Sequence, residues 1–551
     1  MEYYDLGRHG RPVTTRSPEA QLWFDRGLVW CYGFNHEEAV ICFREALAHD
    51  PDCAMAHWGV AYASGPNYNL PWDLFDAPGK ARALATAFDA TARALALADR
   101  ASPQERALIE ALAARYPART PQEDQAPWDR AYAAALRDAL RRFPEDRDLR
   151  ALFAEALMQL TPWKMWDLAT GHPAEGAATA EAQQVLEEAL ERDPGAMEHP
   201  GLLHMYLHLM EMSPTPEKAL RAADALRDLV PDAGHLVHMP THIDVLCGQY
   251  PDVLEGNRRA IAADRKYYAR AGGMNFYTAY RQHDYHFAIY GALFLGQYGP
   301  ALAAAEELIE TTPEALLRME SPPMADYLES YLAMVPHVHI RFGKWAEILA
   351  MPLPEDRGLY CTVAATILYA RGIAHAALGD VAQAERAAEA FDAARAAVPE
   401  SRLLHNVRVV DLLAIAEAML TGEIAYRKGA HESAFEHLRR AVALDDALPY
   451  DEPWGWMQPT RHALGALLLE QGRLDEAEAV YRDDLGLSGR LPRALVHPDN
   501  VWSLRGLADC LERRGGDMPE RIHLAQRLAL AEARADGPVR ASCFCARTAI
   551  T

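Results

Sequence analysis

Apolar residues in this chain recur at spacings of three and four positions over long segments. Near the C-terminal end, one such series runs through Leu464, Leu467, Leu468, Leu474, Ala477, Val480 and Tyr481. This spacing gathers apolar side chains on one face of an α-helix, whereas a half-buried strand would alternate them. Alternating runs are essentially absent from the sequence, so the pattern predicts an all-α protein.

Turns that contain glycine separate the helical segments, and they follow a repeating plan. Residues 20–52 suggest a helix, a turn, a second helix and then Pro51, with Gly27 twelve positions before Ala39 and with Phe43 and Ala46 after it. Similar turns begin at Gly248, Gly296, Gly343, Gly379, Gly429 and Gly472. The unit resembles a tetratricopeptide repeat, in which small residues let two antiparallel helices approach closely. The resemblance implies a right-handed α-α superhelix over nearly the whole chain.

We expect four parts along the chain. These are N-terminal repeats at 18–197, histidine-rich central repeats at 198–345, C-terminal repeats at 346–540 and a tail at 541–551. Aromatic-rich insertions interrupt the repeats at about 64–80, 161–175, 271–281 and 451–460. Because plain connecting loops are usually polar, tryptophan-rich ones are expected to fold back onto the body of the protein or to line a pocket.

Charge and composition narrow the classes of partner. The 551 residues carry a net charge of -23, which does not suit binding to a phosphate backbone, so we expect no nucleic acid partner. No run of 18 apolar residues suggests a membrane span, and residues 1–5 have no feature of an export signal. The eight cysteines show no disulfide framework. We therefore expect a cytoplasmic protein.

Histidines are concentrated in the middle of the chain. Eight of the 22 histidines lie between residues 199 and 286, namely His199, His204, His208, His235, His238, His242, His283 and His286. His204 and His208 are four positions apart and Glu211 follows three later, so all three share a helix face. His235, His238 and His242 also share a face. The separation along the chain is 34 positions both from His204 to His238 and from His208 to His242, which is the tetratricopeptide period.

Equivalent positions in successive repeats should stand side by side. When the turn glycine is counted as position 15 of its repeat, the histidines fall at positions 2, 5 and 9 of the first helix. The family resemblance implies that these positions face the concave groove. The sequence therefore predicts that imidazoles from three consecutive helices line one wall, with His199, before Pro200, capping a helix.

Neutral imidazole is the commonest metal ligand in proteins. We expect His204, His208, His238 and His242, with His286, His235 and His283, to bind one or two divalent ions of copper, zinc or iron. Tyr280, Tyr277 and Glu211 are candidate catalytic residues, since tyrosines near the wall can donate a proton or stabilise an oxyanion. Ala271–Asn275 contains two glycines and is a candidate lid. A metal-free pocket for an anionic ligand is an alternative.

The whole chain is similar to a group of bacterial tetratricopeptide proteins that carry the segments FNHEEA, DPDCAMAHWG, HPGLLHMYLH, GHLVHMPTH and SCFCAR. The resemblance to this group does not imply a particular activity. Cys543 and Cys545 in the last segment suit a soft metal or redox chemistry, an inert end, or a thiolate that reaches the histidine wall.

The functional prediction is a metalloprotein, favoured as a metal-dependent hydrolase or oxidoreductase acting on a small molecule. A non-enzymatic scaffold that binds a protein or peptide in the groove, and a metal carrier or sensor, are the alternatives.

Overall fold

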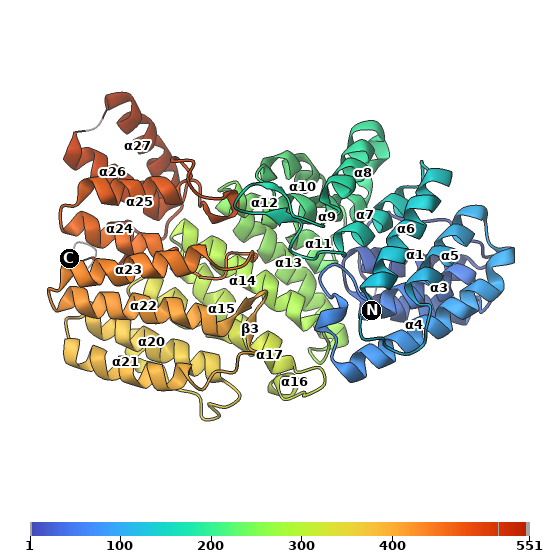
Figure 1. Cartoon of the computed structure of the whole chain (residues 1–551), viewed down its shortest axis with the longest axis horizontal. Helices are drawn as coiled ribbons and strands as arrows, with labels where there is room; N and C mark the ends of the chain where they lie inside the picture. The colour runs from blue at the N-terminus through green and yellow to red at the C-terminus, as the bar shows by residue number, and fades with distance from the viewer. Residues whose placement is uncertain (1–2, 516, 547–551) are drawn as a thin grey trace. The chain divides into compact units, whose positions relative to one another are not determined.

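A computed structural model describes residues 3–515 and 517–546 of the chain (Figure 1). The chain divides into two compact units. The first comprises residues 1–243 and 259–281, and the second comprises residues 244–258 and 282–551. The division into three repeat blocks and a tail, expected from the sequence, stays a prediction.

The first unit consists of antiparallel helix pairs, with neighbouring contacts between α1 and α2, α3 and α4, α5 and α6, and α7 and α8. Three further helices, α12 to α14, have residues in both units. The α-helices to this point are α1 (Pro18–Tyr32), α2 (His36–His49), α3 (Ala54–Ser64), α4 (Ala77–Leu97), α5 (Pro103–Arg115), α6 (Ala126–Arg142), α7 (Arg147–Met158), α8 (Thr179–Arg192), α9 (Pro200–Glu211), α10 (Leu220–Leu226), α11 (Gly234–His238), α12 (Pro240–Leu246), α13 (Tyr250–Ala271) and α14 (Thr278–Leu295).

The second unit continues the same plan, with α20 against α21, α22 against α23, α24 against α25, and α26 against α27. In Figure 1 the helices α20 to α23 lie side by side. Its remaining helices are α15 (Tyr298–Glu310), α16 (Glu314–Leu317), α17 (Met324–Leu328), α18 (Met334–Arg341), α19 (Trp345–Ala350), α20 (Cys361–Ala377), α21 (Val381–Arg395), α22 (Val409–Arg427), α23 (His431–Asp446), α24 (Thr460–Glu470), α25 (Leu474–Asp484), α26 (Val501–Arg514) and α27 (Met518–Glu532).

Strands are limited to two short antiparallel pairs in the described residues. One pair joins β1 (Trp166–Asp167) to β2 (His172–Pro173), and the other joins β3 (Leu403–Leu404) to β4 (Val407–Arg408). Short 3₁₀ turns are η1 (Trp72–Leu74), η2 (Ala98–Arg100), η3 (Pro194–Glu198), η4 (Pro216–Ala219), η5 (Glu329–Ala333) and η6 (Arg493–Leu495). The all-α, tetratricopeptide-like fold expected from the sequence is confirmed.

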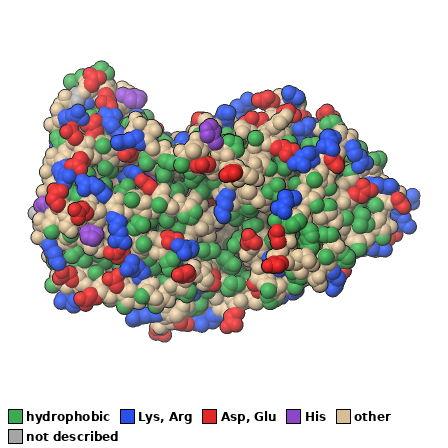
Figure 2. Space-filling model, viewed as in Figure 1, with side chains coloured by type: hydrophobic (Ala, Val, Ile, Leu, Met, Phe, Trp, Pro, Cys, Tyr) green, Lys and Arg blue, Asp and Glu red, His purple; other side chains and the backbone are tan. Residues whose placement is uncertain are grey.

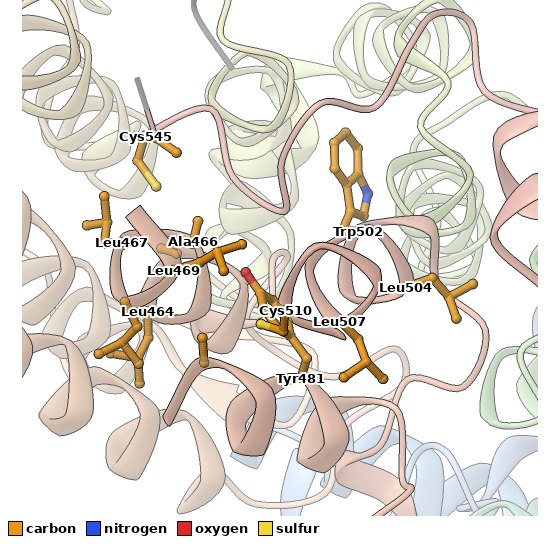
Figure 3. Packing of buried hydrophobic residues seen from close by; sticks show 14 of the residues in the cluster. Leu464, Ala466, Leu467, Leu469, Tyr481, Trp502, Leu504, Leu507, Cys510 and Cys545 are labelled. Carbon is orange, nitrogen blue, oxygen red and sulfur yellow. The ribbon is translucent and has the colours of Figure 1, made fainter. Parts of the chain in front are cut away.

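In both units an aromatic ring packs between glycines of the two flanking helices. In the first unit, a Cβ atom added to Gly27 of α1 or to Gly59 of α3 would lie 2.7 or 2.5 Å from the ring of Phe43 on α2. In the second unit, Tyr481 of α25 lies in the same way between Gly465 of α24 and Gly506 of α26. Figure 3 shows Tyr481 among the buried apolar side chains of this unit. Small residues therefore let successive helix pairs stack closely, as the sequence pattern predicts.

Replacing Gly506 of α26 by alanine is expected to destabilise the second unit. The added Cβ would lie 2.1 Å from Cζ of Tyr481, whose ring is fully buried and already in contact with Gly465. We expect a loss of about 1–3 kcal/mol in the free energy of unfolding, measured by urea denaturation. The matched control is Gly358→Ala, where the nearest atom is 3.5 Å away. Equal stabilities for the two variants would contradict this packing.

The aromatic-rich insertions fold back onto the body, as expected. Tyr68 and Trp72 in the first insertion are buried, and the Trp166 indole of the second donates a hydrogen bond of 2.7 Å to the Leu209 carbonyl. Trp454, in the fourth insertion, is also buried. Acidic and basic side chains are interspersed over the face shown in Figure 2. Among the described residues, no helix has the length and apolar character needed to span a bilayer.

The C-terminal tail packs onto the second unit. The guanidinium groups of Arg341 on α18 and Arg427 on α22 donate hydrogen bonds to the carbonyl oxygens of Ser542 and Cys545. Cys543 and Cys545 are bonded to each other as a disulfide. The tail is therefore anchored as far as residue 546, and residues 547–551 lie outside the described residues.

A candidate metal centre of buried histidines

Five histidines and one glutamate meet in the core of the first unit. His204, His208 and Glu211 project from α9, and the other three are His235 and His238 of α11 and His242 of α12. Each of the six side chains is at most 1% exposed. Burying this many polar rings is costly unless their nitrogen atoms are satisfied, so the arrangement calls for specific partners.

Local sequence explains how the two helical segments present these side chains. Pro200 starts α9, and the His199 ring caps it by accepting a hydrogen bond from the Leu202 backbone N–H at 3.2 Å, as expected. The sequence suggested one continuous helix face for the second set of histidines. The structure corrects this, because Pro240 has no N–H to continue the helix and α12 begins there. Met239 keeps helical backbone angles, so the rings stay together.

An oxygen acceptor holds the Nδ1 atom of three of the histidines. The two carboxylate oxygens of Glu211 accept from two rings, His208 Nδ1 at 2.8 Å and His242 Nδ1. The carbonyl oxygen of Tyr32 accepts from His204 Nδ1 at 2.6 Å. Since Nδ1 donates its proton in each case, the lone pair of the neutral ring is on Nε2. An oxygen acceptor on the remote nitrogen is the usual way in which a protein orients a metal-binding imidazole.

The Nε2 atoms of two of these rings, His204 and His242, face other imidazoles. His204 Nε2 lies 3.1 Å from His235 Nε2, and His238 Nε2 lies 2.6 Å from His242 Nε2. Two nitrogens bound to one tetrahedral ion would be about 3.3 Å apart, given bonds of about 2.0 Å. Ligand nitrogens of His204, His208 and His235 all lie within 4.8 Å of one another. The geometry is therefore close enough to hold a metal ion.

The electrostatic environment keeps His235 neutral. Burial, together with the neighbouring imidazoles, lowers the pKa of His235 well below its ordinary value. Its Nδ1 atom is buried without a hydrogen-bond partner among the described residues. A neutral imidazole with an available lone pair is the form that binds a metal ion.

The 34-residue offset predicts one of the neighbouring histidine pairs and does not predict another. His208 and His242 share Glu211 and their ring centroids are 5.7 Å apart, which agrees with the offset. His204 also contacts His235, with ring centroids 4.9 Å apart, and the offset does not predict this pair.

Aromatic rings surround the histidines. Phe34 packs against three of them, Tyr68 lies 4.9 Å from the His208 ring, and the Tyr280 ring meets His235 edge-on at 5.0 Å. Burial raises the pKa of the Tyr280 phenol well above its ordinary value, so the phenol stays protonated and can donate a hydrogen bond. Aromatic side chains therefore border the buried cluster.

Tyr277 has structural contacts at the start of α11. Its hydroxyl accepts a hydrogen bond from the His235 backbone N–H at 3.2 Å and donates one to Asp264 at 3.1 Å. The candidate lid is fastened to the start of α14, since the Thr278 hydroxyl donates a hydrogen bond to the Gly273 carbonyl at 2.9 Å. Catalytic roles for Tyr277, Tyr280 and Glu211 stay predictions, and their contacts suit orienting roles as well.

His283 and His286 lie on the part of α14 that belongs to the second unit. There the His283 ring lies 4.9 Å from the ring of His405, and His286 Nε2 lies 2.8 Å from the sulfur of Met457. Burial, with smaller effects of neighbouring imidazoles, lowers the pKa of His286 to about 3. Their expected place in the same wall stays a prediction.

Three further residues contact the histidine cluster, and the sequence patterns did not indicate them. Phe34, Tyr68 and the Tyr32 carbonyl come from the first repeat and the first insertion, more than 130 positions before the start of α9. No spacing rule connects them to the histidines. The only available signal was the presence of aromatic residues in a turn and an insertion, where polar residues are usual.

Comparisons with known proteins add little to this geometry. No family model and no curated protein matches the chain. Among solved structures, the Cut9–Hcn1 hetero-tetramer of the APC/C matches at 13% identity and a TM-score of 0.25, covering 97% of this chain and 96% of that one. Naa15/Naa10 bound to HypK matches at 15% identity and a TM-score of 0.21, covering 94% and 72%. Yeast Tom70 matches at 13% identity and a TM-score of 0.24, covering 94% and 90%. Likenesses this distant assign no function.

Proposed function

We propose that this chain is a metalloenzyme that holds one or two transition-metal ions in the histidine cluster and acts on a small molecule. The ligands are His204, His208, His235, His238 and His242. Neutral imidazoles suit zinc, copper and iron, so the bound metal decides between the two reaction classes that the sequence leaves open, hydrolysis and oxidation. When bound, such an ion supplies Lewis-acid or redox chemistry.

The observation that carries this proposal is the set of acceptors on the Nδ1 atoms. Three of the five rings have an oxygen acceptor on Nδ1, which places the lone pair of each neutral ring on Nε2, the atom that would bind a metal ion. Glu211 orients two rings and the Tyr32 carbonyl orients a third, and the Nε2 atoms of His204 and His242 face other imidazoles. An N–H···N hydrogen bond within each pair satisfies these atoms without an ion, and a bound ion would replace that hydrogen bond.

Burial argues against a peptide scaffold as the role of this cluster. A scaffold that clamps a peptide would have to expose the side chains that touch it, yet the five histidines are at most 1% exposed. In the proposed reaction, the Tyr280 phenol donates a hydrogen bond to a developing oxyanion, while Glu211 and Tyr277 hold the ligand-bearing segments in place.

The metal content of protein purified without a histidine tag tests the proposal. Mass spectrometry is expected to find about one or two equivalents of a single transition metal per chain, either as purified or after reconstitution with zinc, copper or iron. The absence of bound metal after all three reconstitutions would refute the proposal.

A second candidate function, protein binding, is supported by the last helix. Met518, Ile522 and Leu530 of α27 are 60%, 53% and 68% exposed, so this helix presents large apolar side chains to solvent. We expect Ile522→Glu to abolish the capture of a specific protein partner that the wild-type chain retains in pull-down, because the charge would be buried at the interface. The control is a variant that lacks ligand histidines, which should keep the partner. An unchanged set of partners in Ile522→Glu would contradict this function.

A further inference from the structure

Phe34 occupies a backbone position that this fold otherwise gives to glycine. It follows α1 with a φ angle of 54°, in the left-handed region that side chains with a Cβ rarely adopt. The Phe34 N–H donates to the Cys31 carbonyl and the Asn35 N–H donates to the Trp30 carbonyl, each at 3.0 Å. This pair of bonds defines a Schellman motif, whose left-handed residue is usually glycine because glycine has no Cβ to clash.

Other repeats of the same chain show the ordinary solution. The described residues contain seven further turns with the same pair of bonds, and in each of them the left-handed residue is glycine with a φ angle between 62° and 84°. These glycines are Gly248, Gly296, Gly343, Gly379, Gly429, Gly472 and Gly486. The phenylalanine is therefore unfavourable for the turn itself, and such strain is retained where the side chain has another purpose.

The side chain of Phe34 lies on the histidine cluster. Its ring centroid is 4.5 Å from that of His204, and it stacks on His208 at 5.8 Å and on His235 at 5.5 Å. These are the three histidines whose nitrogens form one potential ligand group. Phe34 is 3% exposed, and the turn is fixed against α11 because a Cβ at Gly33 would touch Leu236 at 3.6 Å.

We propose that Phe34 is a specificity-determining residue that closes the three-histidine group to all but very small exogenous ligands. An ion held by three histidines keeps coordination positions open for water or substrate. The phenylalanine ring fills space next to all three imidazoles, so it restricts the size of a ligand that can bind to an ion held there. This inference rests on the proposed metal centre and adds a limit on the size of its substrate.

Ligand binding to the cobalt(II)-substituted protein tests the inference. Azide and imidazole are titrated into the wild type and into Phe34→Gly, and the visible absorption of the cobalt ion reports coordination. Glycine is the native choice at seven equivalent turns, so this variant is expected to fold and to bind the same amount of cobalt. We expect at least about tenfold tighter imidazole binding in Phe34→Gly than in the wild type, and a smaller change for azide.

Two further variants keep the outcome interpretable. Phe34→Leu retains part of the bulk and is expected to bind imidazole with intermediate affinity, and it replaces the glycine variant if that chain does not fold. Asp499→Gly is the matched control, because Asp499 is exposed and has a φ angle of 56° in the second unit. Cobalt bound normally, with equal imidazole affinities in the wild type and both Phe34 variants, would overturn this inference alone. The same gain in Asp499→Gly would also overturn it, whereas failure of the wild type to bind cobalt would refute the metal centre as well.

Discussion

Replacing His204 and His238 together by alanine is expected to reduce the bound metal from about one or two equivalents to nearly none. The two substitutions remove one imidazole from each facing Nε2 pair, so neither His235 nor His242 retains its partner. A transition-metal ion bound by neutral imidazoles depends on several simultaneous ligands, and loss of two leaves too few for tight binding. Mass spectrometry of the tag-free protein measures the result.

The control for this double variant removes two histidines elsewhere. His431 and His437 lie on α23, away from any cluster of ligand atoms in the described residues. Their replacement by alanine should leave the metal content unchanged. Circular dichroism establishes that each variant keeps its helical fold. If the His204/His238 variant keeps its metal, or if the control loses as much, the assigned ligands are wrong.

Glu211→Gln is expected to weaken metal binding by roughly 10- to 100-fold without unfolding the protein. The amide has the same shape as the carboxylate, but one of its two terminal atoms is an NH₂ donor. Glu211 accepts from both His208 Nδ1 and His242 Nδ1, so one of these rings would face a donor and lose the acceptor that fixes its tautomer. The affinity is measured by competition with a chromogenic chelator.

A control variant distinguishes the effect of Glu211 on the orientation of the histidine rings from the effect of its negative charge. Glu187→Gln serves as the matched control, because Glu187 lies on α8 of the same unit and accepts a hydrogen bond of 3.2 Å from Tyr206, which is not a ligand. Removing that charge should not change the affinity. A wild-type affinity in Glu211→Gln would mean that the glutamate does not orient the ligands. A loss of metal in both variants would point to an effect of net charge.

Much of the fold could be predicted from the sequence because its causes are local. The three- and four-residue spacing of apolar positions defines a helix face within a single segment, and a left-handed turn after a helix favours glycine wherever it occurs. The same reasoning placed His204, His208 and Glu211 on one face of α9. Because repeats stack with a nearly constant period, the 34-residue offset also predicted that His208 and His242 are neighbours.

The tertiary structure alone decided how these side chains are joined. The sequence did not show that Glu211 accepts from rings on two helical segments, or that His204 contacts His235. Nor did it show that Phe34 covers the ligands from a turn 170 positions before His204. Spacing fixes the direction of a side chain around its own helix axis. Contacts between distant segments depend instead on how helices pack, which is set by the volume and shape of many side chains at once.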